Sequence, residues 1–535
     1  MDYGLLSLLP PLIAILLAIA LRQVIVPLLL AILCGAVLLS GVDRGIVAFL
    51  LDTGRGFSSA IWKSVTAYDH VRALIFSLAL GAMVGVLEAG GGMVAVVNRL
   101  ASRIRSRRGA QTLIAGFGLG IFFDDYANTL LVGGTMRTTA DRFGISRAKL
   151  AYLVDTTSAP VAGLSPISTW VVTEISYVAA GLAAASIVDV SAFALLMASL
   201  PFRFYPLLAL VMVFTIAASD RDFGPMRRAL PHEPPTAGPP TAGPPHQDTE
   251  PSTAAIESSP PGSPSGWLGW AAIIPIVACV GAVLGTLYWT GGGHGIDDFR
   301  SLRRLGTIIS NGDSYGALIC GGMVGLALAV LLHKVLGGIS FYPLGIGALR
   351  GAMHMLPAMA ILWLAWALSD QTGAEQLNTG GFIASWLGES VPPPLLPTAV
   401  FIISAGVAFS TGTSWGTMAI LTPISMHLAI MVSGGQPYSN IALATLGSVL
   451  AGAIFGDHCS PISDTTVLSS RASGCDHITH VRTQIPYALT IGVISIVLGT
   501  IPVAMGLSPY LCLLMGAVAA VAMVWLIGKK PDAKL

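Results

Sequence analysis

The tetrapeptide Ser-Pro-Ile-Ser occurs twice in this sequence: in Asp-Thr-Thr-Ser-Ala-Pro-Val-Ala-Gly-Leu-Ser-Pro-Ile-Ser-Thr (residues 155–169) and in Gly-Asp-His-Cys-Ser-Pro-Ile-Ser-Asp-Thr (residues 456–465). Each copy lies inside a long apolar segment, where proline removes a backbone donor and clustered hydroxyls compete for backbone groups. Each copy also lies close to an aspartate. A single match would be weak, but two at corresponding places predict a duplicated chain with one broken helix in each half.

The composition indicates a membrane protein. Only 10% of the residues are charged and 54% are hydrophobic, whereas a soluble chain carries roughly a quarter charged residues. Apolar stretches recur from end to end, close to the length that crosses a hydrocarbon core of about 30 Å. We therefore expect an all-α polytopic protein, multi-pass in the cytoplasmic (inner) membrane, with the lipid bilayer as its surroundings. The net charge of +1 gives no indication of a nucleic-acid partner.

One polar interruption divides the chain. Residues 219–266 are rich in Pro, Thr, Ser and Gly, and such a composition predicts a disordered linker, here on the cytoplasmic side. We therefore predict a first transmembrane repeat over residues 1–218 and a second over residues 267–507. Residues 508–535 would form a final transmembrane helix and a short basic cytoplasmic tail.

Each half has a second interrupted segment upstream of its broken helix, at residues 116–129 and at residues 409–417. Basic residues flank the first on both sides, and the positive-inside rule places both flanks in the cytoplasm. This predicts a re-entrant helical hairpin. Between Arg350 and Arg471 there is neither Lys nor Arg, so we expect the second hairpin to enter from outside. The two repeats would then have inverted topology.

The candidate ion- or substrate-binding residues cluster at these interruptions. An ionisable side chain in the bilayer costs roughly 2.5–3.5 kcal/mol on insertion scales, and a broken helix adds free carbonyl and hydroxyl oxygens that small cations prefer. We expect Na⁺ at Asp125, Asn128 and Asp155, and again at Thr413, Asp457 and Asp464. The full candidate set is Asp124, Asp125, Asn128, Thr129, Asp155, Thr156, Ser158, Thr411, Thr413, Ser414, Asp457, Ser460 and Asp464.

A buried carboxylate suits the exchange of one cation for another. Loss of water disfavours its charged form, so it holds either a proton or a cation. Competition at one site combined with alternating access gives obligatory exchange, with Na⁺ and H⁺ as cargo and no resident cofactor. Structural roles are the alternative: Asp124 or Asp125 as a helix cap, Asp155 paired with Lys149, and Asp464 as a cap.

The chain resembles the NhaC family of sodium/proton antiporters over most of its length apart from the linker. The runs that carry the resemblance are residues 122–129 with 155–160, and residues 412–416 with 455–465. The resemblance implies two inverted repeats in which cations bind where hairpin tip and helix break meet. It also implies homodimers. Some relatives look like exchangers of organic acids or transporters of amino acids, so the substrate stays open.

Three functions remain to be compared. The first is Na⁺/H⁺ antiport. The alternative is sodium- or proton-coupled transport or exchange of a small carboxylate or amino acid. It needs a site for an anionic group, which a hairpin N-terminus, hydroxyls or a buried Arg could provide. No Arg or Lys lies inside the candidate segments, but the hydroxyl-rich breaks could hold a carboxylate. A distant alternative is an intramembrane aspartyl protease built on Asp125 and Asp457, although Gly456-Asp457 lacks the full Gly-x-Gly-Asp pattern. We expect a transporter and not an enzyme.

Overall fold

The computed structural model describes residues 3–21, 24–40, 45–229, 267–293, 308, 311–373, 375–379, 382, 392–461 and 463–530. Within these residues all regular elements are helices, apart from one antiparallel bridge between Asp222 and Lys529. The all-α class predicted from hydropathy is confirmed.

The helices of the first half follow one another with short connections. They are η1 (Gly4–Leu8), α1 (Leu9–Leu21), α2 (Ile25–Leu39), α3 (Ile46–Thr66), α4 (Tyr68–Ala89), α5 (Gly92–Ala101), α6 (Arg107–Gly120), α7 (Asp125–Arg142), α8 (Arg147–Thr156), α9 (Ala159–Leu164), α10 (Thr169–Ala184), α11 (Ala192–Ser199), η3 (Leu200–Phe202), α12 (Phe204–Ser219) and η4 (Gly224–Arg228).

The second half begins after the Pro-rich segment. Its helices are α14 (Leu268–Thr290), α16 (Ser314–Gly337), α17 (Phe341–His354), α18 (Leu356–Thr372), η6 (Pro393–Leu395), α20 (Leu396–Thr411), α21 (Ser414–Val432), α22 (Asn440–Cys459), α23 (Asp464–Ser473), α24 (His477–Ile494), the π-helical turn η7 (Ser495–Thr500), α25 (Ile501–Ala504) and α26 (Pro509–Ile527).

Many of these helices can cross a membrane. Among the described residues, nine helices are long and apolar enough, and two further helix pairs qualify together although they are bent, by 48° within residues 147–184 and by 50° within residues 192–219. α6 and α7 are not among them, and the first re-entrant hairpin stays a prediction. α20 and α21 each pass the same test, so length alone does not distinguish a second re-entrant hairpin from two spans. The inverted orientation of the halves stays a prediction.

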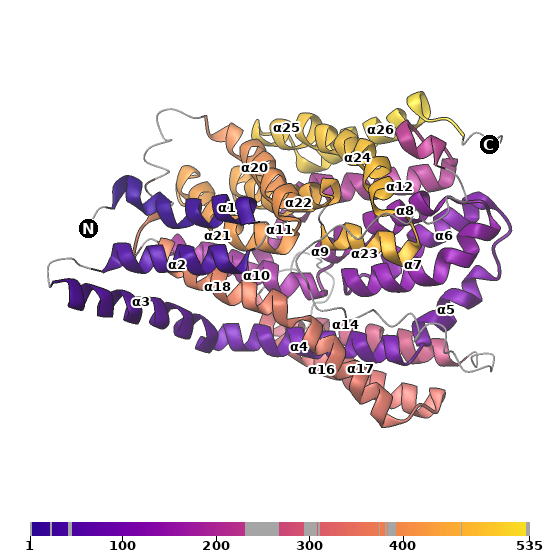
Figure 1. Cartoon of the computed structure of the whole chain (residues 1–535), viewed down its shortest axis with the longest axis horizontal. Coiled ribbons are helices and arrows are strands. Elements are labelled where there is room, and N and C mark those ends of the chain that lie inside the picture. The colour runs from indigo at the N-terminus through magenta and orange to yellow at the C-terminus, as the bar shows by residue number, and fades with distance from the viewer. Residues whose placement is uncertain are drawn as a thin grey trace.

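A layer of long helices flanks the rest of the molecule. α4, α14, α16 and α17 pack together along the lower edge in Figure 1, while α7, α8 and α23 lie together on the right. α4 and α17 cross with their backbones in contact: a Cβ added to Gly85 would lie 2.0 Å from the carbonyl oxygen of Gly347. Small residues spaced four apart allow this approach, which is a common way to join helices in a membrane.

The first residues of the predicted linker are packed against the rest of the protein. Residues 219–229 are ordered: Asp222 is buried, its side chain pairs with Lys149, and its backbone bridges to Lys529. The composition of this stretch explains this packing, because the Pro- and Thr-rich repeats start only beyond it, while Asp222 provides a partner for a buried lysine. Residues 230–266, the remainder of the predicted linker, lie outside the described residues.

Candidate cation site

The tip of the first hairpin lies between α6 and α7. Asp124 caps α7: its Oδ1 accepts a hydrogen bond from the Ala127 amide at 2.8 Å, and its Oδ2 accepts one from the Thr169 hydroxyl at 3.0 Å. The backbone amide of Thr169 also donates to the Phe123 carbonyl at 2.9 Å. Asp is among the best N-cap residues because it accepts from the free amides of the first turn. Both oxygens of Asp124 are therefore engaged by the protein.

The first turn of α7 carries buried oxygen atoms that lack donors. Both carboxylate oxygens of Asp125, Oδ1 of Asn128 and Oγ1 of Thr129 have no hydrogen-bond partner within the described residues, and all three side chains are 0% exposed. The Trp170 indole lies next to Asp125 without a hydrogen bond of ordinary geometry. Positions i, i+3 and i+4 share one helix face. Buried polar groups are rarely left unsatisfied, so this face is suited to a ligand that accepts electron pairs from oxygen.

The amide of Asn128 ties the hairpin to the first helix break. Its Nδ2 donates to the carbonyl oxygens of Gly118 at 2.7 Å and Thr157 at 2.8 Å. Thr157 lies where α8 ends and the chain unwinds before α9. The predicted contact between hairpin tip and helix break is therefore made through backbone carbonyls.

The two Ser-Pro-Ile-Ser motifs have the same structural role. The last serine of each is an N-cap: Ser168 accepts from Val171 N at 3.2 Å to begin α10, and Ser463 accepts from Thr466 N at 3.4 Å to begin α23. Proline ends the preceding helix because it lacks an amide hydrogen. The repeated motif is thus a stop and restart of the helix in each half.

In the second half the hairpin and the break meet through side chains. Thr413 caps α21, accepting from Gly416 N at 3.3 Å. Its neighbour Ser414 donates to Oδ2 of Asp457 at 2.9 Å, and Thr465 donates to the same oxygen at 3.3 Å. Oδ1 of Asp457 has no partner in the described part of the chain. Asp457 thus has one oxygen held by hydroxyls and one without a donor.

Side-chain hydrogen bonds connect the candidate residues of the first half with those of the second. Tyr126, in the first half, donates its hydroxyl hydrogen to Asp464 in the second. Asp155, in the first half, directs its Oδ2 toward α23 and α24, where Thr466 donates at 3.3 Å and Gln484 at 2.5 Å. The carboxylates of both halves of the chain therefore belong to one polar region.

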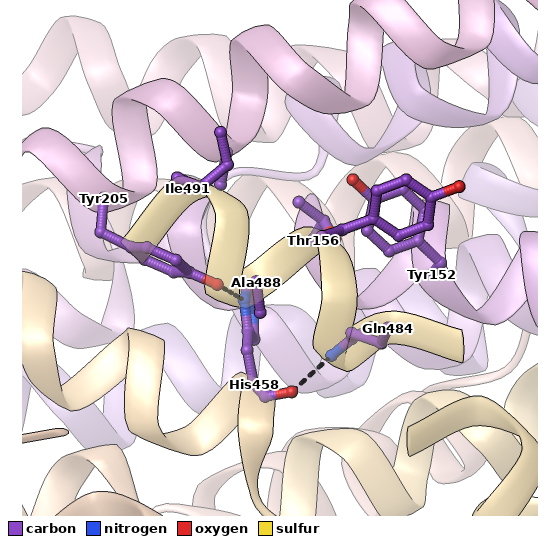
Figure 2. A pocket seen from close by; sticks show the side chains of 9 residues that line it. Tyr152, Thr156, Tyr205, His458, Gln484, Ala488 and Ile491 are labelled. Carbon is purple, nitrogen blue, oxygen red and sulfur yellow. Dashed lines mark hydrogen bonds between the residues drawn. The ribbon is translucent and has the colours of Figure 1, made fainter. Parts of the chain in front are cut away.

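The remaining predicted residues have local roles. Ser158 donates to the Asp155 carbonyl at 2.8 Å, Thr411 to the Val407 carbonyl at 2.8 Å and Ser460 to the Phe409 carbonyl at 2.7 Å. Thr156 lines a cavity about the size of one water molecule (Figure 2). These four hydroxyl side chains therefore support the backbone at the breaks and the wall of the cavity.

Two buried ion pairs lie among the helices near the first break. Lys149 pairs with Asp222 and not with Asp155. Glu174 pairs with Arg203, Nη2 to Oε2 at 2.9 Å, and Arg203 also donates to the Gly163 carbonyl at the end of α9. Arg203 is buried next to the first break although it is remote from it in sequence, so local patterns did not identify it as the partner of Glu174.

Sequence reasoning also missed Tyr126, His480 and Gln484. Tyr126 is adjacent to the Asp-Asp pair, and its position was a usable signal. His480 and Gln484 lie four residues apart on one face of α24, with Nε2 of His480 2.9 Å from Oε1 of Gln484 and 3.4 Å from Oδ2 of Asp155. Polar residues at helical spacing at the start of an apolar span were the signal for this pair.

In the ranges that the structure covers, no three His, Cys, Asp or Glu side chains meet as metal ligands do. A cation here would be held by one or two carboxylates together with neutral oxygens. That donor set suits a monovalent hard cation.

A comparison with protein families decides the class. The model of the Na⁺/H⁺ antiporter family matches residues 161–501, which include the second half of the candidate site. The chain belongs to this family. Members are transporters, so the protein is a secondary transporter and the protease alternative falls away.

This Na⁺/H⁺ antiporter family member is also similar to individual proteins. An uncharacterized protein of Haemophilus influenzae is 33% identical over 485 residues, covering 91% of this chain and 88% of its own. The malate-2H⁺/Na⁺-lactate antiporter of Bacillus subtilis is 35% identical over 137 residues, covering 23% of this chain and 28% of its own. The crystal structure of the Alcanivorax borkumensis YdaH transporter has the same fold, with a TM-score of 0.55 and 15% identity, over 92% of this chain and 99% of that one.

Proposed function

We propose that this protein exchanges Na⁺ for H⁺ at the polar region between its two repeats. The observation that carries the proposal comes from the first turn of α7. There, Asp125, Asn128 and Thr129 have four buried oxygen atoms that accept no hydrogen bond from the described residues. A Na⁺ ion would accept electron pairs from oxygens of this kind, whereas a proton on Asp125 would neutralise the carboxylate itself. Either species restores the balance of a buried carboxylate, and the two exclude each other.

Asp155, Asp457 and Asp464 extend the site into the second half. Oδ1 of Asp155 and Oδ1 of Asp457 lack partners in the portion of the chain described here. Asp464 and Asp155 lie within electrostatic range of Asp457. Like charges disfavour one another at short range, so a cation or a proton is needed for these carboxylates to remain buried together. Exchange of one for the other would then keep the charge of the site constant during transport.

The setting of the transporter is part of the proposal. Basic residues around α6 and α7 favour a cytoplasmic location for both flanks of the first hairpin, and we propose the cytoplasmic membrane as its site. We also propose that the protein works as a homodimer, as the family resemblance implies.

A second candidate is exchange of a small carboxylate coupled to Na⁺ or H⁺. The similarity to the malate-2H⁺/Na⁺-lactate antiporter favours it. The buried Arg203 is the group that would bind an anion, but Glu174 already neutralises it at 2.9 Å. A carboxylate substrate would have to displace Glu174, which makes bare cation exchange the simpler function.

The test uses the purified protein in sealed liposomes that contain a pH-sensitive dye. A proton gradient is imposed, and NaCl or KCl is added without any organic substrate. Antiport predicts dissipation of the gradient by Na⁺ in wild type and its loss in Asp125→Asn and Asp457→Asn. If Na⁺ has no effect in wild-type vesicles, the antiporter proposal is wrong. Labelled dicarboxylates and amino acids, tested in the same vesicles under a Na⁺ gradient, then examine the second candidate.

A further inference from the structure

We propose that Gln484 is a positioning residue that holds Asp155 and the end of α22 at a fixed separation and thereby sets the affinity of the site for Na⁺. The inference rests on the proposed function, since it takes Asp155 and Asp457 as cation ligands. Gln484 lies on α24, outside both hairpins and both broken helices, and belongs to none of the motifs that define the candidate site.

A single nitrogen atom of Gln484 connects two segments from opposite halves. Nε2 donates to Oδ2 of Asp155 at 2.5 Å and to the backbone carbonyl of His458 at 3.0 Å. Figure 2 shows the second of these bonds, with the amide reaching the carbonyl of His458. The side chain is 1% exposed. An amide nitrogen has two hydrogens, so both are used and neither is left for water.

Each of the two acceptors belongs to a helix end at the site. Asp155 is in the last turn of α8, and His458 follows Asp457 in the last turn of α22. The final carbonyls of a helix have no partner within it, so the His458 carbonyl needs a donor from elsewhere. By serving both, Gln484 makes the position of Asp155 depend on the break that carries Asp457.

The surroundings restrict the movement of this amide. Oε1 of Gln484 is 2.9 Å from Nε2 of His480, so both ends of the amide are engaged. Gln484 also lines the water-sized cavity, together with Tyr152, Tyr487 and His458, among others. A leucine has nearly the volume of glutamine, so Gln484→Leu removes the hydrogen bonds with little change in packing.

The chain supplies a matched control. Gln111 on α6 is also buried, at 0% exposed, and its Nε2 also donates to an aspartate, Asp220, at 2.6 Å. Asp220 ends α12 and has no place in the candidate site. Gln111→Leu therefore removes the same kind of bond, between the same kinds of group, away from the proposed ligands.

The experiment measures Na⁺ binding without requiring transport. The melting temperature of the purified protein is followed as NaCl replaces N-methylglucamine chloride at constant ionic strength, and the Na⁺ concentration at half of the maximal shift is compared. For Gln484→Leu this concentration should rise about tenfold or more, because a hydrogen bond to a charged group is lost. For Gln111→Leu it should equal that of wild type, even if the melting temperature itself falls.

A second comparison separates positioning from general loosening. In an Asp155→Asn background, Gln484→Leu should cause little further change in the half-maximal Na⁺ concentration, because the residue through which it acts is already altered. Equal Na⁺ affinity of Gln484→Leu and wild type would overturn the inference, and so would equal losses in Gln484→Leu and Gln111→Leu. Either result would leave wild-type Na⁺/H⁺ exchange in vesicles intact, so the inference and the proposed function fail separately.

Discussion

Asp124 and Asp125 are neighbours on the chain, yet only the side chain of Asp124 is supplied with hydrogen-bond donors. Asp124 accepts from the Ala127 amide and the Thr169 hydroxyl, whereas neither oxygen of Asp125 has a partner among the described residues. The difference arises because Asp124 occupies the N-cap position, facing the free amides of α7, while Asp125 begins the helix proper and projects from it. The two carboxylates therefore have different proposed roles, one in folding the tip and one in holding the cation.

Exchanging each aspartate for asparagine should separate these roles. Asp125→Asn removes the negative charge, so a buried Na⁺ would lose its counter-charge at a cost of roughly 3 kcal/mol. Na⁺-dependent proton flux in liposomes should therefore fall by about 100-fold or more. Asp124→Asn keeps a good N-cap, so the half-saturating Na⁺ concentration should stay within about twofold and the loss of stability below about 1 kcal/mol. Equal loss of flux in the two variants would contradict the assignment.

Competition between Na⁺ and H⁺ predicts a definite pH dependence. A carboxylate of the site must release its proton before it binds Na⁺, so lowering the pH should raise the half-saturating Na⁺ concentration. For one-for-one competition the rise is about tenfold per pH unit where the site is protonated, and it levels off at alkaline pH. Initial rates at several Na⁺ concentrations and pH values, in vesicles without a membrane potential, measure this slope. A half-saturating Na⁺ concentration that does not change with pH would show that Na⁺ and H⁺ do not compete for one site.

Local pattern was enough to predict the helical class and the places where the helices break. Apolar length predicts a helix, and Ser-Pro-Ile-Ser predicts where it stops and restarts, because capping and the missing proline amide act within a few residues. The candidate ligands on α7 were found in the same way. Each of these features is determined by residues that are close in sequence, so each can be predicted from its own segment alone.

Local patterns could not predict the contacts between the two halves of the chain. Asp155 and Gln484 are 329 residues apart, and the rotation of α24 that brings them together is decided by packing. The two halves also differ in where their carboxylates stand in the sequence: when the Ser-Pro-Ile-Ser motifs are aligned, Asp155 falls opposite Leu450 and Asp457 opposite Ala162. The helix breaks therefore correspond between the halves, while the carboxylates do not.

The buried pair of Arg203 and Glu174 should stabilise the fold only as long as both charges are present. Arg203→Met leaves Glu174 charged and buried and should lower the free energy of unfolding by about 3–5 kcal/mol. The double variant with Glu174→Gln should recover most of this loss, because no lone charge remains. Thermal unfolding of the purified proteins measures both. Arg147→Met, at a partly exposed pair with Asp141, is the control and should cost at most about 1 kcal/mol.

The outcome for the double variant also bears on the substrate. If it is folded and still exchanges Na⁺ for H⁺, Arg203 has a structural role in cation exchange. If it folds but loses transport of a carboxylate that wild type carries, Arg203 is the anion-binding group of the second candidate function. A double variant as unstable as Arg203→Met would instead show that the bond to the Gly163 carbonyl contributes more than the ion pair.

The crossing of α4 and α17 gives a prediction about folding that is independent of the cation. Gly85→Ala places a methyl group 2.0 Å from the carbonyl oxygen of Gly347, with backbone on the opposing side that has no flexible end to move away. The helices must separate, and we expect a loss of about 1–3 kcal/mol in the free energy of unfolding, the usual cost of overpacking. Gly345→Ala is the matched control on α17, since nothing lies within 4 Å of the added atom. There alanine should be neutral or stabilise the helix by up to about 1 kcal/mol, because it restricts the backbone. Melting temperatures of the two variants in the same detergent decide the matter, and a Gly85→Ala protein as stable as Gly345→Ala would mean that the two helices do not cross in contact.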